Sequence, residues 1–417
     1  MTDPMDLAAR LFDGLAALSQ DPPGVTRPSF SHQENAAHAL LADCAADLGC
    51  TTTHDAAGHQ YMTWPGADRD APRVIVGSHV DTVAHGGNYD GAAGVVMGLA
   101  ALALLRERDV RPSVDLCVMA IRAEELVWFP TPYCGSRMAF GLLDRDELTT
   151  LARSDTGRTL ADHMREVGAD PDALRAAGRT LDPATIAAFI EPHIEQGPVL
   201  EAAGEAVGIV TGIRGNLRYR HGTITGRWDH AGAVPREHRA DAVRAGAALV
   251  VEVEDLWDAH DAAGEDFVAT FGEFWTDPTM HGLTKVPGHV RFTLDMRSLD
   301  NALLWWADDA LRGAARRIGE AHGVTIDLGA PTNAEPALMD ERLMRLLEEG
   351  AAALGVPHRR MPSGGGHDCA TFAGQGVPSA MLFVCNQNGS HNPDEAMRME
   401  DFAAATRVLA RTLEALL

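Results

Sequence analysis

Short apolar runs recur along the chain, and four of them end shortly before a histidine or a carboxylate. Runs of this length are typical of strands that are buried on both faces. In an open α/β sheet, ligands bind beyond the carboxyl ends of the strands, so the residues that follow four such strands would meet at one edge. The runs cover residues 74–76, 116–121, 186–190 and 380–384, and the polar residues that follow them include His79, Glu125, His193 and His391.

The first of these runs leads into a histidine, a nearby aspartate and a glycine-rich turn. His79 and Asp81 are separated by one residue, and Asp90 follows in the stretch Gly86-Gly87-Asn88-Tyr89-Asp90-Gly91. Glycines on both sides let the backbone turn tightly enough to bring Asp90 back towards His79. Such a strand and loop are suited to collecting metal ligands. On these residues alone, an ordinary strand–loop–helix remains an alternative.

Helical patterns separate the apolar runs and predict an α/β fold whose mixed, mostly parallel sheet is flanked by helices. Ser31 and Glu34 have the spacing of a capping box at the start of one helix. The helices are predicted over residues 5–19, 32–48, 91–105, 340–354 and 401–416.

Residues 213–328 follow a different pattern, which predicts a smaller β-α-β-β-α-β domain inserted into the larger one. A chain of 417 residues is long for a single core, which also favours two domains. We expect the larger domain to comprise residues 1–212 and 329–417. Within the insertion, strands are predicted over residues 216–225, 266–274, 289–297 and 324–328, and helices over 239–260 and 299–322.

Composition excludes several classes of function. A net charge of −24 argues against binding to nucleic acid or to anionic membranes. No run reaches the roughly 18 consecutive apolar residues of a membrane span, and the acidic N-terminus lacks the pattern of a signal peptide. The six cysteines are scattered without a CxxC spacing, which indicates free thiols in a reducing cytoplasm.

The residues at the strand ends have the composition of a dinuclear metal site. Two metal ions that share a bridging carboxylate need about five ligands from His, Asp and Glu. Asp90 is the expected bridge because its loop can place a carboxylate between two ions. Asp81 can accept the second N–H of the His79 imidazole and fix its tautomer. The predicted ligands are His79, Asp90, Glu125, His193 and His391.

Two adjacent carboxylates follow the second apolar run. Glu124 and Glu125 would repel each other at a strand end, and the structural alternative is a solvated pair in a loop. If Glu125 binds metal, Glu124 is free to act as the general base that deprotonates the attacking water. We favour this functional interpretation.

Other candidate residues have weaker support from the sequence. His230 lies in the insertion, where a surface or turn histidine is the simpler interpretation. Arg297 could pair with a substrate carboxylate, or with Asp295 or Asp300. The glycine run 363–368, which contains Gly365, could present backbone N–H groups to an anion. Further possible ligands are His85, His221, His281 and His367.

Several stretches between about residue 24 and the C-terminus carry these residues: GSHVDTVAHGGNYDG, AEELVWFPTPYCGSRMAFG, IEPHIEQGPVLE, HAGAVP with RADA, PGHVRFTLDMRSLD, SGGGHD and GSHNPDE. In content and order they resemble the amidase family that holds N-carbamoyl-L-amino-acid hydrolases, β-ureidopropionase and allantoate amidohydrolase. That family belongs to the clan of dinuclear metallo-aminoacylases and exopeptidases. The stretch HIEQGPVLE is typical of the carbamoylase branch.

The resemblance implies a catalytic domain with two divalent metal ions per chain, and an inserted lid domain that forms a homodimer. Zinc is the expected metal, and manganese, cobalt or nickel are alternatives. One ion would be held by His79, Asp90 and His193, and the other by Asp90, Glu125 and His391, with Glu124 as the base.

The resemblance also implies roles for residues outside the metal site. His230 would reach across the dimer and polarise the scissile carbonyl, and Gln196 and Arg297 would hold the substrate, with Arg297 on its carboxylate. Arg218 matches the family's pattern, and we include it with Gly365 among the substrate contacts.

The chain departs from the family's pattern near the expected substrate. Thr284 stands where the family usually has an asparagine that contacts substrate. Residues 126–129, Leu-Val-Trp-Phe, are bulkier and less polar than the usual Gly followed by Arg-Phe. We therefore expect an intact metal site beside an altered substrate pocket.

The expected reaction is hydrolysis of a linear C–N amide in a small molecule that carries a carboxylate. The favoured substrate is the ureido group of an N-carbamoyl-L-amino acid, with amino acid, ammonia and carbon dioxide as products. Allantoate or another ureide is the nearest alternative, followed by an N-acyl-amino acid or dipeptide. A non-catalytic, metal-stabilised binding protein is the remaining interpretation.

Overall fold

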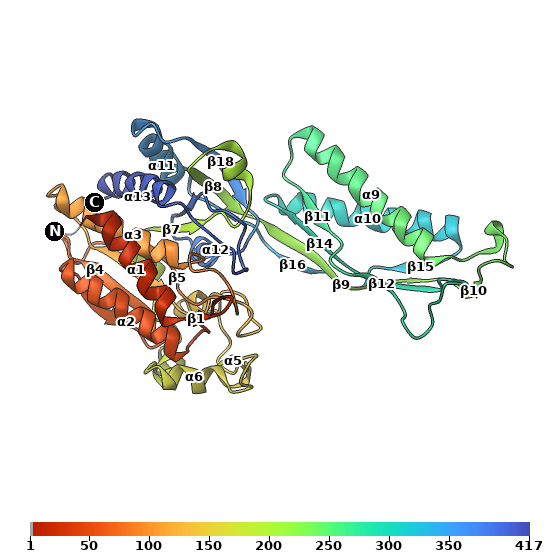
Figure 1. Cartoon of the computed structure of the whole chain (residues 1–417), viewed down its shortest axis with the longest axis horizontal. Coiled ribbons are helices and arrows are strands. Elements are labelled where there is room, and N and C mark those ends of the chain that lie inside the picture. The colour runs from red at the N-terminus through yellow and green to blue at the C-terminus, as the bar shows by residue number, and fades with distance from the viewer. Residues whose placement is uncertain (1–2) are drawn as a thin grey trace. The chain divides into compact units, whose positions relative to one another are not determined.

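The computed structural model describes residues 3–417 (Figure 1). Contacts divide the chain into two compact units. The larger unit contains the residues up to Thr211 and from Leu338 onward, and the second unit contains Gly212–Ala337.

The larger unit is built on a nine-stranded sheet in the order β17-β8-β19-β7-β5-β6-β4-β3, with β18 paired to β8. Parallel pairing joins the four central strands β19, β7, β5 and β6. The pairings of β8 with β19, β4 with β6 and β3 with β4 are antiparallel. The strands are β3 Thr51–His54, β4 Gln60–Trp64, β5 Arg73–His79, β6 Leu116–Ile121, β7 Ile186–Ile194, β8 Val207–Ile213, β17 Ala337–Leu338, β18 His358–Ser363 and β19 Ser379–Val384.

The predicted α/β class with a mixed sheet is therefore confirmed, and an antiparallel strand borders the four parallel strands on each side. The four apolar runs form the four parallel strands. The third strand is longer than predicted, because β7 continues through His193 to Ile194. The antiparallel strands β3 and β4 are absent from the prediction. Thr51–His54 is mostly exposed and lacks an apolar run, and in the buried β4 the polar residues Gln60 and Thr63 interrupt the apolar ones.

Helices cover both faces of this sheet. On one face, α1 and α13 pack beside α3, which contacts β5 and β7 (Figure 1). On the other face, Phe372 of α12 stacks on Phe189 of β7 with ring centroids 3.7 Å apart. The helices are α1 Pro4–Leu18, α2 His32–Asp47, α3 Ala92–Glu107, α4 Cys134–Ala139, α5 Glu147–Thr150, α6 Leu160–Glu166, α7 Pro171–Ala177, α8 Val199–Ala203, α11 Glu341–Ala353, α12 Asp368–Gly374 and α13 Met399–Glu414.

The central helix α3 begins where the chain leaves the Asp90 loop. It is apolar around its whole circumference and almost entirely buried, as expected for a helix inside a domain. Its N-cap residue Gly91 has a φ of 63°, and a Cβ atom there would lie 2.4 Å from the His79 ring. Only glycine therefore fits between the helix and this histidine.

The second unit consists of an antiparallel sheet covered by α9 (Ala242–Ala263) and α10 (Asn301–His322). Its core includes Ile224, Leu249, Leu294 and Leu311. The sheet has the order β11-β14-β9-β15, with β12 paired to β14 and β16 paired to β9. The strands are β9 Gly215–Thr225, β11 Val268–Thr270, β12 Phe274–Thr276, β14 His289–Ser298, β15 Thr325–Asp327 and β16 Thr332–Ala334, and the separate pair is β10 Asp229–His230 with β13 Lys285–Val286.

The second unit extends beyond residue 328, the predicted end of the insertion, to Ala337. The added segment contains β16, whose Asn333 pairs with Leu217 of β9. Its strand is short, exposed and without apolar alternation, so the sequence pattern does not reveal it.

The six cysteines are free, as expected. Within residues 3–417, no helix has both the length and the apolar character needed to cross a membrane.

Candidate metal centre

The carboxyl ends of the parallel strands bring the predicted ligands together. His79 is the last residue of β5, and His193 lies next to the end of the neighbouring strand β7. Glu125 follows β6, and His391 lies in the loop after β19. Asp90 comes from the loop before α3. Because these neighbouring strands run in one direction, side chains remote in the sequence converge at one edge of the sheet.

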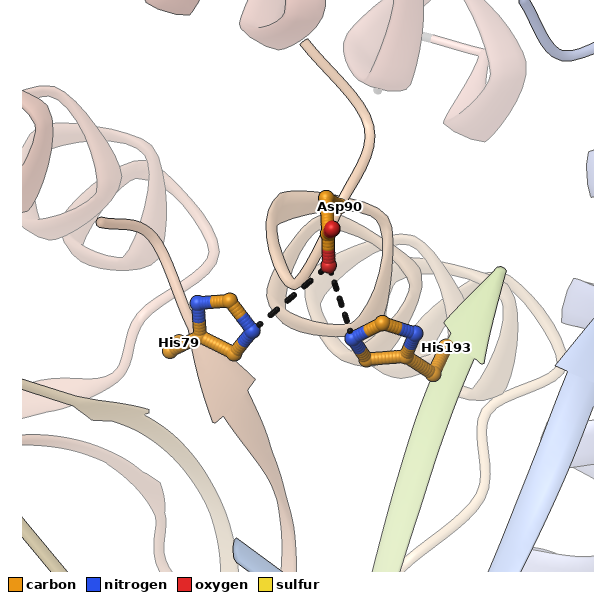
Figure 2. A group of neighbouring side chains, drawn as sticks. All are labelled: His79, Asp90 and His193. Carbon is orange, nitrogen blue, oxygen red and sulfur yellow. Dashed lines mark ion pairs between the residues drawn. The ribbon is translucent and has the colours of Figure 1, made fainter. Parts of the chain in front are cut away.

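Three buried residues form what we call the first donor group: His79, Asp90 and His193. Asp90 Oδ1 lies 3.8 Å from His79 Nε2 and 3.2 Å from His193 Nε2. Figure 2 shows both imidazoles directed at the same carboxylate. Their ligand atoms lie within 4.8 Å of one another, which is compatible with one shared cation.

Asp90 also belongs to the second donor group, which contains Glu125 and His391. His391 Nε2 lies 3.2 Å from Asp90 Oδ2 and 3.7 Å from Glu125 Oε1. The two oxygens of Asp90 thus face different groups, as a carboxylate that bridges two ions must do.

The outer nitrogens of the two buried imidazoles are bound to backbone oxygens. His79 Nδ1 lies 3.0 Å from the carbonyl of Asp81, and His193 Nδ1 lies 2.9 Å from that of Ile194. A carbonyl only accepts hydrogen bonds, so each Nδ1 carries a proton when the ring is neutral. Each Nε2 then has its lone pair available for a metal, and in this structure the lone pair of His193 Nε2 accepts the backbone N–H of Gly91 at 3.2 Å.

The carboxylate of Asp81 mainly organises the next loop. It lies 3.4 Å from His79 Nδ1, farther than the carbonyl of the same residue. It accepts hydrogen bonds from Ser29 Oγ at 2.5 Å and from the backbone nitrogens of Glu125 and Glu124 at 3.2 and 3.4 Å. Asp81 therefore connects the His79 strand end to the glutamate pair.

The glutamate pair is buried at the edge of the donor groups. Glu124 Oε2 lies 3.8 Å from His79 Nε2. Burial, together with Glu125, raises the pKa of Glu124 well above its usual value, although His79 opposes the shift. Burial and Asp90 raise the pKa of Glu125 to about 8. Both carboxyls need nearby positive charge to ionise at neutral pH.

Divalent cations fit this set of residues. Glu125 Oε1 is buried and has no hydrogen-bond partner among the described residues, although it lies 3.7 Å from His391 Nε2 of the same donor group. Burial would raise the pKa of Asp90, but the hydrogen-bonded imidazoles of His193 and His391 hold it well below its usual range. An ionised bridging carboxylate, an unpartnered carboxyl oxygen and correctly oriented imidazoles are what two hard or borderline cations require.

The loops around the centre contain unusual backbone conformations. Ala123, Gln196, Asn388 and His391 have positive φ angles between 56° and 65°. Such angles are strained for residues other than glycine and persist only where the surrounding structure holds them. Their concentration around the donor groups is typical of a functional site.

Two of the predicted substrate contacts lie near the donor groups, one beside Asp90 and the other beside the first. Gln196 Nε2 donates a 2.8 Å hydrogen bond to Asp90 Oδ2. A Cβ atom on Gly365 would lie 2.9 Å from Gln196 Oε1, so the glycine run passes next to this side chain. His367, from the same run, packs against His193 with ring centroids 4.4 Å apart but is in neither donor group.

His230 and Thr284 are neighbours in the second unit. Thr284 O accepts the backbone N–H of Ala231, and His230 pairs with Lys285 across β10 and β13. The backbone nitrogens of Gly232 and Ala233 donate to His230 Nδ1 at 3.1 and 3.2 Å. In the neutral imidazole the proton is therefore on Nε2, where this exposed side chain can donate a hydrogen bond.

Arg218 and Arg297 lie on the adjacent strands β9 and β14 of the second unit and share one carboxylate. Arg297 donates through Nε and Nη2 to Asp295 Oδ2 at 3.0 and 2.7 Å. Arg218 Nε lies 3.2 Å from Asp295 Oδ1. The pairing of Arg297 with Asp295, one of the alternatives that the sequence leaves open, is thus present.

Ser29, Ser390 and Glu395 contact the site and were not identified from the sequence. Ser29 binds Asp81, and Ser390 Oγ lies 2.7 Å from Asp90 Oδ2. Glu395 accepts hydrogen bonds from the Asp90 loop. The only sequence signal for the last two is their position in the stretch GSHNPDE around His391.

The chain is similar to known proteins over most of its length. The sequence profile of Peptidase family M20/M25/M40 matches residues 75–415. An N-carbamoyl-L-amino acid amidohydrolase from Geobacillus stearothermophilus is 35% identical over 94% of this chain and 93% of its own length. An allantoate amidohydrolase from Escherichia coli is 32% identical over 96% of this chain and 95% of its own length.

A solved structure extends the comparison to the fold. The hydantoinase/carbamoylase family amidase from Burkholderia multivorans is 30% identical, with a TM-score of 0.90 over 99% of this chain and 97% of its own. Enzymes of this family typically use a dinuclear site of divalent metal ions, for which the two donor groups are candidates. The chain therefore belongs to peptidase family M20/M25/M40 and is an amidohydrolase whose structural neighbours are amidases of the hydantoinase/carbamoylase type.

Proposed function

We propose that the chain is a dinuclear-metal-dependent amidohydrolase that cleaves the ureido group of an N-carbamoyl-L-amino acid. The products are the amino acid, ammonia and carbon dioxide. The observation that supports this proposal most strongly is the pair of donor groups that share Asp90, with Glu124 beside them.

In this proposal the first donor group, His79 with Asp90 and His193, holds one cation, and the second, Asp90 with Glu125 and His391, holds the other. Each group offers imidazole nitrogens and carboxylate oxygens, which are common ligands of zinc. Zinc is therefore the proposed metal, and manganese, cobalt and nickel are alternatives that accept the same ligands. When bound, the two cations supply Lewis-acid polarisation of the substrate carbonyl and lower the pKa of the attacking water.

Glu124 is the proposed general base. Its carboxylate lies at the edge of the donor groups, within 3.8 Å of a ligand nitrogen of His79. It would take a proton from the attacking water and return it to the leaving nitrogen. Asp81 supports this step because its carboxylate accepts hydrogen bonds from the backbone N–H groups of Glu124 and Glu125. These bonds hold the backbone from which both glutamate side chains extend.

The second unit would supply the contacts that recognise the substrate. The guanidinium groups of Arg218 and Arg297, which lie side by side at Asp295, are of a kind that binds the carboxylate of an amino acid. The proton on His230 Nε2 suits a carbonyl oxygen that gains negative charge. We propose that His230 acts on the active site of a second subunit in a homodimer, as the resemblance implies, with Thr284 next to it.

Relatives support a ureido substrate without distinguishing among ureides. The curated relatives include N-carbamoyl-L-amino acid and allantoate amidohydrolases at 32–35% identity. We favour the carbamoyl compound because the stretch around His193, HIEQGPVLE, is typical of that branch. Allantoate is the second candidate, and a cytoplasmic location is part of the same proposal.

A substrate panel tests the proposal directly. Ammonia release is measured from purified protein loaded with zinc, manganese or cobalt. The compounds are N-carbamoyl-L- and D-amino acids, N-carbamoyl-β-alanine, allantoate and N-acetyl amino acids. We expect release from N-carbamoyl-L-amino acids that a chelator abolishes. Release confined to allantoate would move the assignment to the second candidate, and no release from any ureide would refute both.

Glu124→Gln tests the assigned base. We expect turnover to fall about 10²–10⁴-fold, the usual contribution of general acid–base catalysis, while two metal ions per chain remain bound. The measurements are kcat and metal content of the same preparation. Glu201→Gln, at an exposed position on α8, is the matched control and should behave as the wild type. Near-normal turnover by Glu124→Gln would remove Glu124 from the mechanism.

A further inference from the structure

We propose that Glu395 is a positioning residue that holds the loop of Asp90 and the loop of His391 in a fixed relation to each other. The inference rests on the proposed function in one respect, namely that the donor groups bind cations. It assigns no chemical step to Glu395.

The carboxylate of Glu395 is hydrogen-bonded to both loops at once. Its Oε1 accepts from the backbone nitrogens of Tyr89 and Asp90 at 2.9 and 3.2 Å. Its Oε2 accepts from Ser390 Oγ at 2.6 Å. Tyr89 and Asp90 precede α3, whereas Ser390 directly precedes His391. One side chain thus ties together segments about 300 residues apart in the sequence.

Ser390 lies between two carboxylates. Its Oγ is 2.6 Å from Glu395 Oε2 and 2.7 Å from Asp90 Oδ2. A hydroxyl has one proton and can donate to only one of them at a time. Asp90 Oδ2 also accepts from Gln196, so it keeps a donor when the hydroxyl turns towards Glu395. The serine that precedes His391 therefore remains anchored while Asp90 uses lone pairs for a cation.

Tight packing and loop closure make this anchor rigid. Glu395 is 7% exposed, and a Cβ atom on Gly87 would lie 2.2 Å from its Oε1 and 2.4 Å from its Cβ. The loop that carries His391 is closed at its base by two backbone hydrogen bonds between Gln387 and Ala396. Since Glu395 is adjacent to Ala396, its carboxylate is fixed relative to this base.

The consequence for metal binding follows from the shared ligand. Asp90 serves both donor groups, and its backbone nitrogen is one of the atoms that Glu395 holds. Partners of metal ligands typically contribute 10–100-fold to metal affinity or activity. Without Glu395, the Asp90 and His391 loops would lose their common anchor, and the second donor group would suffer most because two of its three members are in these loops.

The test measures zinc affinity by competition with a chromophoric chelator, and no substrate is needed. Glu395→Ala should bind at least one of its two ions about 10–100-fold more weakly than the wild type. Glu395→Gln keeps an amide oxygen for the two backbone N–H groups and an NH₂ for Ser390 Oγ, so its affinity should stay within about threefold. Asp394→Asn removes an exposed neighbouring carboxylate and should bind as the wild type does.

Wild-type affinity in Glu395→Ala, or an equal loss in Asp394→Asn, would overturn the inference. If Glu395→Ala does not yield folded protein by circular dichroism, Ser390→Ala decides. This variant removes one of the three anchored donors and should weaken zinc binding about 2–10-fold, whereas unchanged affinity would refute the inference. If Glu395→Ala binds zinc more weakly but the wild-type protein hydrolyses no ureide, the role of Glu395 is supported and the proposed substrate is refuted.

Discussion

The two histidines of the first donor group lie in strands of the sheet, whereas all three members of the second group lie in loops. His79 and His193 lie in strands, are 1% exposed, and have their outer nitrogens held by backbone carbonyls. His391 lies in a loop and is 52% exposed, and no hydrogen bond holds its Nδ1 within residues 3–417. The first group is therefore preorganised by the fold, and the second depends on how its loops are anchored. We expect the two cations to bind with different affinities.

Asp90→Ala should have the largest effect, because it removes the ligand common to both groups. We expect both ions to be lost, with affinities more than about 100-fold below the wild type, beyond the range expected for residues that only support a ligand. Metal content after dialysis at fixed free zinc measures this loss. A variant that retains two ions per chain would show that the groups do not share Asp90.

The comparison is tested most directly by His193→Ala and His391→Ala. Each variant should lose one ion, but the loss in affinity should be about tenfold greater for His193→Ala, since that imidazole is already oriented for binding. Zinc titration of both variants under one set of conditions provides the measurement. Equal losses would contradict the expected difference between the two donor groups.

The second donor group should also depend on pH. A hydrogen bond to Asp90 raises the pKa of His391 to about 9, and burial raises that of Glu125 to about 8. Both are protonated at pH 7 before metal binds, and a cation must displace these protons. Apparent affinity should thus rise about tenfold or more per pH unit from pH 7 to 9 and level off above. Calorimetry in buffers of different ionisation enthalpy counts the released protons, and a flat profile would contradict the assignment.

Ser29→Ala should have the smallest effect. The hydroxyl donates to the Asp81 carboxylate, which retains the backbone N–H groups of Glu124 and Glu125. One lost hydrogen bond predicts about a 2–10-fold decrease in kcat with both ions retained. The first donor group should be unaffected, because His79 is held by the carbonyl of Asp81. A lost ion would indicate that Ser29 supports the ligands themselves.

The convergence of the strand-end residues at one edge of the sheet can be predicted from the sequence for a physical reason. A buried parallel strand needs a continuous apolar run, and the carboxyl ends of such strands share one edge. The convergence of His79, Glu125, His193 and His391 therefore follows from the order of apolar runs and polar residues along the chain. Asp90 could be predicted as a further member of the site because the glycines around it permit a tight turn that brings it back towards His79.

The other contacts of the site and the short outer strands depend on tertiary packing, which leaves no periodic pattern in the sequence. Ser29 and Glu395 resemble ordinary polar residues of loops, and only the fold shows what they contact. Strands β3 and β16 are short and largely exposed, so they lack an apolar pattern. The sequence does not decide whether Arg297 pairs with a substrate carboxylate, with Asp295 or with Asp300, because each of them offers the same chemical group.

The position of β19 between β7 and β8 affects how the chain can fold while it is being synthesised. The ribosome completes β7 at Ile194 and β8 at Ile213, but the strand that separates them begins only at Ser379. At about 5–20 residues per second, the edge of β7 waits roughly 10–40 s for its partner. During that time the whole second unit is synthesised while a buried strand of the sheet has an open edge. Nascent chains should therefore depend on chaperones most strongly in this interval, before the last 40 or so residues emerge and close the metal centre.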